Sequence, residues 1–447
     1  MVAKKDGFYI GLFSLAFPIM IQSFINSLVN MVDTIMIGQL GTVAIAAVGL
    51  GNQIYFLLNM VLFGIVSGGA VFTAQYWGKK DIPSIKTTTG FCLTLVLAVG
   101  MLFAGTCFFF PRSIIGIYSS DLAVIQEGGK YLRIASLSFL PFSVSFLFTI
   151  ILRSVERIRV SVISTVISLT LNVILNYLFI FGYGKIPAMG VAGAGLATVI
   201  SRLVEMVIIL TVSYVKKYPP AGTLRELFSF STTFAAQFSR IAVPVILNEI
   251  MWGMGTTLQS VIFARTNTDA IAAFNITNTI SNLTWVFYIG LANGVSVMIG
   301  KKIGEGDHLT AREYAKRIIR FAPLTAPAVA GLLFFLRLLI PFFFNVSPEA
   351  LSYLNSMFIL LAIAYPFRAF NITMIIGVSR AGGDTRYCAI YDLFFMWAIA
   401  LPAAAIAAFR FGAPVWLIYF FVMSEEIMKV FPGLLRFKSG KWLHDVT

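Results

Sequence analysis

The chain has 447 residues, of which 58% are hydrophobic and 12% are charged, and its mean hydropathy is +0.88. Soluble domains carry about 25% charged residues, so this composition excludes an ordinary soluble protein and indicates an integral membrane protein. The net charge of +14 does not indicate a nucleic-acid partner, because Lys and Arg concentrate in short loops, where they set membrane topology.

Long apolar runs follow one another along the whole chain, and many reach the ~20 residues that a helix needs to cross the hydrocarbon. They do not show the alternation of membrane-spanning strands. We therefore predict an all-α integral membrane protein with twelve transmembrane helices, at residues 9–37, 43–77, 87–111, 131–152, 160–182, 188–214, 240–264, 270–300, 317–339, 351–379, 387–409 and 414–435.

The basic residues predict the orientation of these helices. Lys and Arg are far more frequent in the N-terminus and the even-numbered loops than in the odd-numbered loops, and we place only Arg202 and Arg368 within spans. The positive-inside rule then puts both termini in the cytoplasm, for a multi-pass protein of the plasma membrane. Lys4-Lys5 and the following apolar run are similar to a signal peptide, but the run is too long, so we interpret it as a retained first helix.

An internal repeat relates the two halves of the chain. A shift of 226 residues places Pro18 on Pro244 and Asn52 on Asn278, and it also superimposes Gly64 on Gly290, Gly68 on Gly294 and Asp81 on Asp307. Six helices in each half make the repeats parallel, as in duplicated transporter bundles with a substrate site near the midplane. We predict an N-lobe at 1–215, a cytoplasmic linker at 216–239 and a C-lobe at 240–447.

Asp33 is the one charged residue between Gly7 and Gly78. It ends a polar stripe along the first helix, formed by Gln22, Asn26, Asn30 and Asp33 at spacings of four, four and three. A second stripe follows the fifth helix and ends in Asn172 and Asn176, after Ser161, Thr165 and Ser168. Two such faces predict a polar cavity in the N-lobe.

An ionised side chain at the centre of a membrane helix costs about 2.5–3.5 kcal/mol, so such acids usually serve proton or cation transport. Burial disfavours the ionised form of an acid, so a proton and Na⁺ can compete for one carboxylate. We hypothesise that Asp33, supported by Asn172 and Asn176, takes up the coupling ion, and we predict no metal beyond Na⁺ at Asp33. The alternatives are a structural ion pair for Asp33 and interhelical hydrogen bonding for the amides.

The repeat does not duplicate the acids, because Asp33 falls on Gln259 and Glu249 on Ser23. In the C-lobe, Glu249 and Asp392 are each isolated in an apolar span, and either is a candidate for cation binding. Asn278 and Asn282, with Trp285, follow helical spacing on the eighth helix and are candidates for the same cavity.

Several chemistries find no support in the sequence. There is no GxxxxGK[ST] loop for ATP, and His308 and His444 lie in hydrophilic segments, which argues against an intramembrane enzyme. Cys92, Cys107 and Cys388 show no paired spacing. We predict a transporter without an organic cofactor. The loops 153–160 and 379–386 carry mixed charges that fit an inner gate or a topological anchor equally well.

The chain resembles the multidrug and toxic compound extrusion (MATE) family along its whole length. The resemblance lies in "MVDTIMIGQLG" at 31–41, "LNVILNYLFIFG" at 171–182, "GVAGAGLATVIS" at 190–201 and "GVSRAGGDTR" at 377–386. It implies a V-shaped pair of lobes, alternating access, and export of cationic or amphipathic compounds in exchange for H⁺ or Na⁺. It also implies that Asp33 is the N-lobe ion-binding acid and that Asn172 accompanies it.

The chain departs from the family pattern at three places. DinF-like and archaeal relatives often have a second aspartate where this chain has Asn176, which favours H⁺ over Na⁺. Glu249 lies about one turn nearer its proline than the seventh-helix glutamate of NorM-like proteins. The tenth-helix aspartate of that branch is missing, with Asn371 and Thr373 in the region, and we infer that Asp392 substitutes for it.

The leading interpretation is a secondary antiporter that exports small lipophilic or cationic compounds, works as a monomer and contacts membrane lipids. The alternative is a flippase for lipid-linked precursors. A flippase is expected to carry several basic residues in its cavity for pyrophosphate, whereas we place only Arg202 and Arg368 within spans. A membrane enzyme is the third possibility, and the sequence offers no nucleophile–base set for it.

Overall fold

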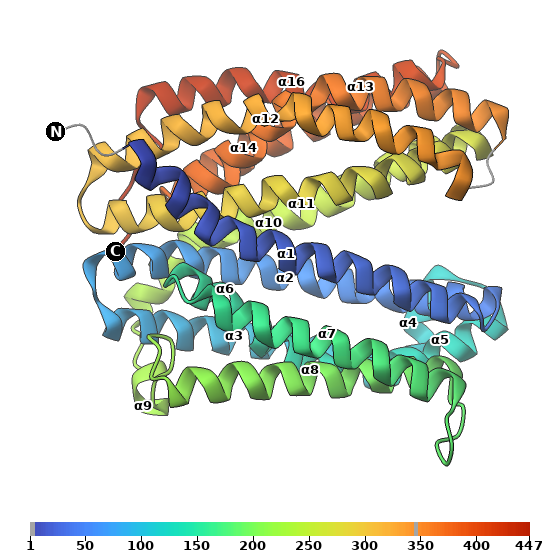
Figure 1. Ribbon diagram of the computed structural model, residues 1–447, viewed down its shortest axis with the longest axis horizontal. Coiled ribbons are helices and arrows are strands. Elements are labelled where there is room, and N and C mark those ends of the chain that lie inside the picture. Colours follow the sequence, from blue (N-terminus) through green and yellow to red (C-terminus); the bar gives the residue numbers. More distant parts are fainter. Residues whose placement is uncertain (1–4, 344–346) are drawn as a thin grey trace. The chain divides into compact units, whose positions relative to one another are not determined.

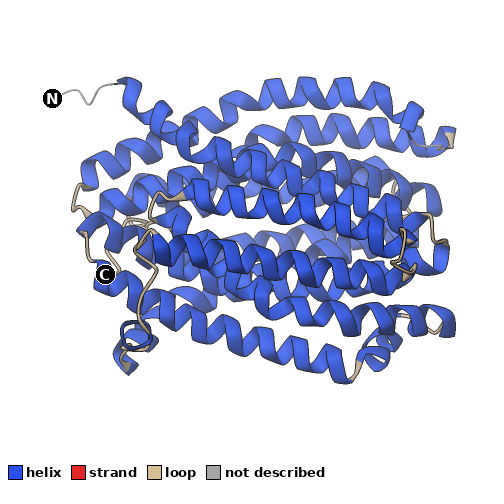
Figure 2. Ribbon diagram, turned by 60° about the horizontal axis from the view of Figure 1, so that its bottom comes forward, coloured by secondary structure: helices blue, strands red, loops and turns tan. Residues whose placement is uncertain are grey.

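The computed structural model describes residues 5–343 and 347–447, and in that part of the chain all regular structure is helical (Figures 1 and 2). The first half contains α1 (Lys5–Gly38), α2 (Thr42–Lys79), α3 (Ile82–Phe109), α4 (Pro111–Tyr118), α5 (Leu122–Ala135), α6 (Phe139–Ser154), α7 (Ile158–Phe181) and α8 (Gly190–Val215). The second half contains α9 (Leu224–Leu227), α10 (Thr232–Thr266), α11 (Thr268–Gly304), α12 (His308–Phe343), α13 (Pro348–Ile372), α14 (Thr385–Phe394), α15 (Leu401–Phe409) and α16 (Val415–Ser439).

The predicted all-helical membrane fold is confirmed. Eleven helical segments in the described residues are long and apolar enough to cross a membrane. The 3₁₀ turn η1 (Ser136–Ser138) joins α5 and α6 into one span, and the π-helical turns η2 (Thr373–Arg380) and η3 (Phe395–Ala400) continue α13 and join α14 to α15. The predicted twelfth span is α16, whose hydropathy is lowered by Glu425, Glu426 and Lys429.

The chain forms two compact units whose boundaries lie inside helices. One unit comprises residues 21–246, and the other comprises residues 1–20 and 247–447. The boundaries therefore fall within α1 and α10, just after Pro18 and Pro244, and not in the linker at 216–239 where we placed the division. The start of α1 belongs with the second half, and the start of α10 with the first.

Glycines at equivalent positions of the two repeats explain why the first part of α1 packs with the second half and the first part of α10 with the first half. A Cβ on Gly64 of α2 would lie 2.6 Å from the Cα of Ile246, and one on Gly68 would lie 2.8 Å from the Cβ of Ala242. In the other unit, a Cβ on Gly290 of α11 would lie 2.4 Å from Met20.

Gly294 completes the pattern, because a Cβ there would lie 3.2 Å from Ala16. Residues 242 and 246 are the repeat equivalents of 16 and 20. In each unit, equivalent glycines therefore pack against the first half of the long helix that begins the other repeat, α1 or α10. The predicted repeat thus has a structural counterpart.

The linker packs against α3 through a short helix. Thr223 and Glu226 form a capping box at the start of α9, and Lys86 pairs with Glu226 at 2.8 Å. The hydrogen bond from Lys86, with others from Thr223, holds the pKa of Glu226 at about 2, well below its usual value. A Cβ on Gly90 of α3 would lie 1.8 Å from the carbonyl oxygen of Leu227, so a glycine is required for this close approach.

We predict that Gly90→Ala lowers thermal stability in detergent, because the added methyl group must push α9 away from α3. Overpacking of this kind costs about 1–3 kcal/mol. Gly105→Ala, on the same helix, is the matched control, since nothing lies within 4 Å of its added Cβ. The control should unfold at the wild-type temperature or slightly above it. Equal midpoints for the two variants in a thermal unfolding assay would contradict the prediction.

Candidate functional site

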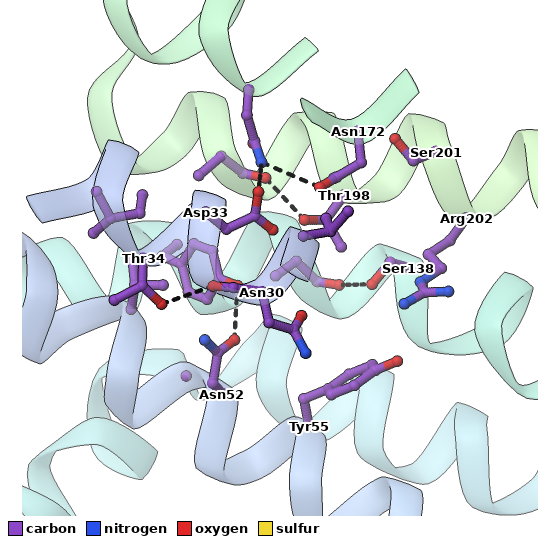
Figure 3. Close-up of a pocket in the computed structure, with 18 of the residues that line it drawn as sticks. Asn30, Asp33, Thr34, Asn52, Tyr55, Ser138, Asn172, Thr198, Ser201 and Arg202 are labelled. Carbon is purple, nitrogen blue, oxygen red and sulfur yellow. Dashed lines mark hydrogen bonds between the residues drawn. The ribbon is translucent and has the colours of Figure 1, made fainter. Parts of the chain in front are cut away.

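A cavity of about 510 Å³ lies within the unit formed by residues 21–246. Residues of α1, α2, α5, η1, α6, α7 and α8 surround it, and Figure 3 labels ten of their side chains. Tyr55, Phe56, Tyr131 and Phe139 supply aromatic surface. Its polar lining residues are Asn30, Asp33, Thr34, Asn52, Asn59, Ser138, Ser168, Asn172, Asn176, Thr198, Ser201 and Arg202.

Asp33 is the one carboxylate among the residues that line this cavity. The side-chain N–H of Asn176 donates to Asp33 Oδ1 at 2.7 Å and also to Asn172 Oδ1 at 3.2 Å. The predicted polar faces of the first and fifth helices therefore meet at the predicted residues. Asn172 and Asn176 are buried and Asp33 is half-buried, so the acid is held by one amide and keeps an open side toward the cavity (Figure 3).

The N-terminal part of the predicted polar stripe on the first helix has a different role. Asn30 lines the cavity, but Gln22 and Asn26 do not. Gln22 is buried and bridges two helices, because it donates to Thr165 at 2.6 Å and accepts from Arg153 Nη2 at 2.6 Å. Asn26 has no hydrogen bond to another described residue. The stripe is too long for one cavity.

Arg202 is the basic residue of the cavity lining, and its charge is compensated. Its guanidinium pairs with Glu205 at 2.7 Å and lies over the ring of Phe142. Thr165 donates to the other oxygen of Glu205, also at 2.7 Å. Sequence reasoning missed Glu205, although an acid three residues after Arg202 within a span was a readable signal for a helical ion pair.

Both predicted C-lobe acids are ion-paired, not isolated. Arg380 Nη2 lies 2.7 Å from Glu249 Oε1, and Lys429 Nζ lies 2.8 Å from Asp392 Oδ1. Asn248 connects the two pairs, because it accepts from Arg380 and donates to Asp392, each at 2.8 Å. The description of Glu249 and Asp392 as lone acids was therefore wrong, since their partners come from segments distant in sequence.

The expectation that only Arg202 and Arg368 lie within spans also needs correction. Lys429 is 3% exposed in α16 and Arg380 is 4% exposed at the end of η2. Lys429 falls inside the predicted span 414–435, and Arg380 lies one residue beyond the predicted span 351–379. The missed sequence signal for Lys429 is its spacing of four from Glu425, which it contacts at 3.0 Å.

Asn278 and Asn282 do not join this network, contrary to our prediction. Asn282 is exposed, and neither amide has a hydrogen bond to another described residue. The polar face of α11 that points inward is instead the one with Ser281 and Thr284. Of the three residues with the predicted 3–4 spacing, Trp285 contacts Arg368, whereas the two amides remain outside the network.

Arg368 is the residue that contacts this inner polar face of α11. It donates to Ser281 at 2.9 Å, pairs with Glu426 at 3.4 Å and stacks over the ring of Trp285, 4.6 Å from its centre. Asn371 donates to the second oxygen of Glu426 at 2.7 Å. Trp285 therefore supports an ion pair within the unit.

The charges of the C-lobe network are unequal in number. Glu249 pairs with Arg380, and Glu426 pairs with Arg368. Lys429, however, serves both Asp392 and Glu425. All three members of this triad are buried, and one carboxylate in it exceeds the available cation.

The two charged loops bind to their own units. Glu156 accepts from the indole of Trp77 at 3.0 Å in the first unit. In the second unit, Asp384 binds Arg436 through two hydrogen bonds of 2.6 and 2.9 Å. The mixed charges at 153–160 and 379–386 thus anchor each loop locally.

The MatE family model matches residues 18–178 and 244–396. The two matches begin at Pro18 and Pro244, which are the residues that the internal repeat superimposes. The chain belongs to the MatE family. Members of this family are transporters and not enzymes, which confirms the predicted family, fold and absence of enzymatic function.

Relatives of this MatE transporter align over nearly its whole length. The uncharacterized transporter YisQ of Bacillus subtilis is 22% identical over 97% of this chain and 94% of its own. A probable multidrug resistance protein NorM of Thermotoga maritima is 24% identical, over 96% and 92% of the two chains.

Solved structures share the fold. The Vibrio cholerae MATE transporter VcmN in its bent form superimposes with a TM-score of 0.86 at 16% identity, over 98% and 99% of the chains. A MOP superfamily transporter of Pyrococcus furiosus, described as having a binding pocket of reverse polarity, superimposes with a TM-score of 0.85 at 22% identity, over 96% of both chains.

We predict that Lys429→Met strongly destabilises the protein, because it leaves Asp392 and Glu425 buried without their cation. Removing one partner of a buried ion pair costs about 3–5 kcal/mol. Adding Asp392→Asn to Lys429→Met should restore part of the loss. Lys441→Met, just after the end of the same helix, is the control, since Lys441 is exposed. Thermal unfolding in detergent measures all three variants, and a wild-type midpoint for Lys429→Met would refute the prediction.

Proposed function

We propose that this MatE transporter is a secondary antiporter that exports small cationic or amphipathic organic compounds in exchange for an inward-moving ion. The observation that carries the proposal is Asp33, the single carboxylate in a cavity of about 510 Å³ with aromatic walls. An organic cation gains from that carboxylate and from the faces of Tyr55, Phe56 and Phe139. The names of its relatives, such as multidrug resistance protein NorM, support the same function.

Ion and substrate compete for Asp33 in this proposal. Among the described residues Asp33 has no cationic partner in direct contact, whereas Glu205, Glu249, Asp392 and Glu426 each contact one. A carboxylate that lacks a fixed counter-ion is the one that can gain and lose a proton or a substrate cation during a transport cycle. The C-lobe acids, in contrast, hold ion pairs and serve first to connect helices.

The surroundings of Asp33 favour a proton over Na⁺ as the coupling ion. Asn176 presents an N–H, not an oxygen, to the carboxylate, so this neighbour does not act as a ligand for a cation there. The described residues contain no group of three or more acidic, His or Cys side chains arranged to hold a metal. A proton needs one carboxylate oxygen, whereas Na⁺ needs several converging oxygens.

The structure weighs against a lipid-linked precursor flippase. A pyrophosphate would need several uncompensated cations, but Arg202, Arg368, Arg380 and Lys429 each contact a carboxylate within 3.4 Å. The additional buried basic residues of the C-lobe therefore do not support a flippase function. We further propose a plasma-membrane location with both termini in the cytoplasm, from the distribution of Lys and Arg.

We predict that Asp33→Asn abolishes ion-driven transport of a fluorescent organic cation in inverted membrane vesicles. The amide keeps the shape of the side chain but removes its charge and its titration. Imposing proton and sodium gradients separately on the wild type identifies the coupling ion, and we expect uptake with the proton gradient alone.

Glu127→Gln is the matched control, because Glu127 pairs with Lys130 at a solvent-exposed site outside the cavity. It should transport like the wild type. Glu249→Gln should lower stability more than it lowers transport per folded molecule. Ion-driven transport by Asp33→Asn at the wild-type rate would overturn the assignment of Asp33 as the coupling acid.

A further inference from the structure

A second pocket, of about 300 Å³, lies at one end of the unit that contains the C-terminus. It is formed where the first turns of α12 meet the end of α16 and the tail that follows it. Its lining residues are Leu309, Arg312, Glu313, Lys316, Phe437, Lys438, Gly440 and Trp442. None of them belongs to the cavity around Asp33.

The pocket is positively charged. Arg312, Lys316 and Lys438 are exposed, and no carboxylate pairs with any of them in the described part of the chain. The one acid of the lining, Glu313, is already bound to Arg317 at 2.9 Å. Three uncompensated cations around one hollow favour an anionic ligand.

Arg312 lies close to the backbone at the end of α16. Gly440 has φ +69°, in the left-handed region, and a Cβ there would lie 2.6 Å from Arg312 Nη2. The guanidinium therefore rests against a residue that only glycine suits. This contact places the guanidinium at the junction of α12 and the tail.

Trp442 gives an independent indication of a ligand. Its side chain is fully buried and stacks with Phe437, at 6.2 Å between ring centres. Its indole N–H is also buried and has no acceptor among the described residues. Because a buried donor without a partner costs free energy, a ligand oxygen that reached this N–H would stabilise the site.

We propose that this pocket binds a phosphate group at the membrane surface. Phosphate oxygens accept bidentate hydrogen bonds from Arg and single bonds from Lys and an indole N–H. Basic pockets between helices on the cytoplasmic side of a membrane protein are typical sites for anionic lipid headgroups. The positive-inside rule predicts that this end of the unit is cytoplasmic.

The neighbouring surface favours a phospholipid over free phosphate as the source. Along α16 the exposed apolar residues Met428, Phe431 and Leu435 follow helical spacing and lead to Lys438. On α12, Arg312 and Lys316 are followed at the same spacing of four by Arg320 and the exposed Leu324. Both helices thus present an apolar face for acyl chains next to a basic end for the headgroup.

Occupation of the pocket would act on the C-lobe charge network. The tail that carries Trp442 also covers the loop after Arg380, because His444 N–H donates to Gly382 O at 2.9 Å. A Cβ on Gly382 would lie 2.1 Å from Trp442 O. Bound phosphate would therefore hold α12, the tail and this loop together.

The test measures lipid binding to the purified full-length protein by native mass spectrometry. The probes are dioctanoyl phosphatidylglycerol, which is anionic, dioctanoyl phosphatidylcholine, which is zwitterionic, and inorganic phosphate. The pocket variant combines Arg312→Gln, Lys316→Gln and Lys438→Gln. Its control combines Lys216→Gln, Lys217→Gln and Arg225→Gln, which remove three exposed charges of the other unit.

We expect one tight equivalent of phosphatidylglycerol. Each removed cation near a membrane surface weakens binding about fivefold, so the pocket variant should lose affinity by a factor on the order of 100. The control should keep the wild-type affinity. Trp442→Phe retains the aromatic stacking and removes the N–H, and it should weaken binding several-fold. Transport of an organic cation by each variant reports that the protein is folded.

The inorganic phosphate arm identifies the source of the ligand. Displacement of phosphatidylglycerol by millimolar phosphate would support a phosphate site that a soluble anion can fill, and failure to displace it would support a lipid site. Equal loss in the pocket and control variants would overturn the proposal. So would phosphatidylcholine binding as tightly as phosphatidylglycerol, because the pocket would then not select charge.

Discussion

The cost of placing a charge in hydrocarbon governs which side chains of this protein are fixed and which can change state. Within the described residues Glu205, Glu249, Asp392, Glu425 and Glu426 each contact a Lys or Arg side chain. Asp33 contacts the amide of Asn176 instead. Asp33 is therefore the carboxylate of the cavity lining that has no cation in direct contact. This difference in partners is the physical basis of the role that we propose for Asp33.

The contact of Asp33 with Asn172 and Asn176 was predictable because these three residues lie on two helices. Periodicity alone places Asp33 on one face of α1 and Asn172 and Asn176 on one face of α7, and a polar face in a membrane helix turns inward. Periodicity does not specify at which level along the two helices their polar faces contact each other. For that reason Gln22 belongs to a bridge with Thr165 and Arg153, although it lies on the same stripe as Asp33.

The C-lobe site was not predictable in the same way. Its pairs join residues far apart in sequence, such as Glu249 with Arg380 and Asp392 with Lys429, and no local pattern specifies such a contact. Arg380 and Lys429 also lie near span ends, where the positive-inside rule assigns bases to the cytoplasm. The π-helical turn η2 ends at Arg380, and a π-helical turn shifts the register of the side chains that follow it, which helical-wheel reasoning does not allow for.

The glycine contacts that close each unit have a consequence for the unity of the chain. Residues 5–20 pack with the C-terminal bundle and the part of α10 up to residue 246 packs with the N-terminal one, so each bundle contains a segment of the other repeat. If the chain were cut at the linker, each fragment would expose small residues that pack, in the intact protein, against a helix of the other fragment. Each repeat therefore depends on the other for one helical segment, which α1 supplies in one direction and α10 in the other.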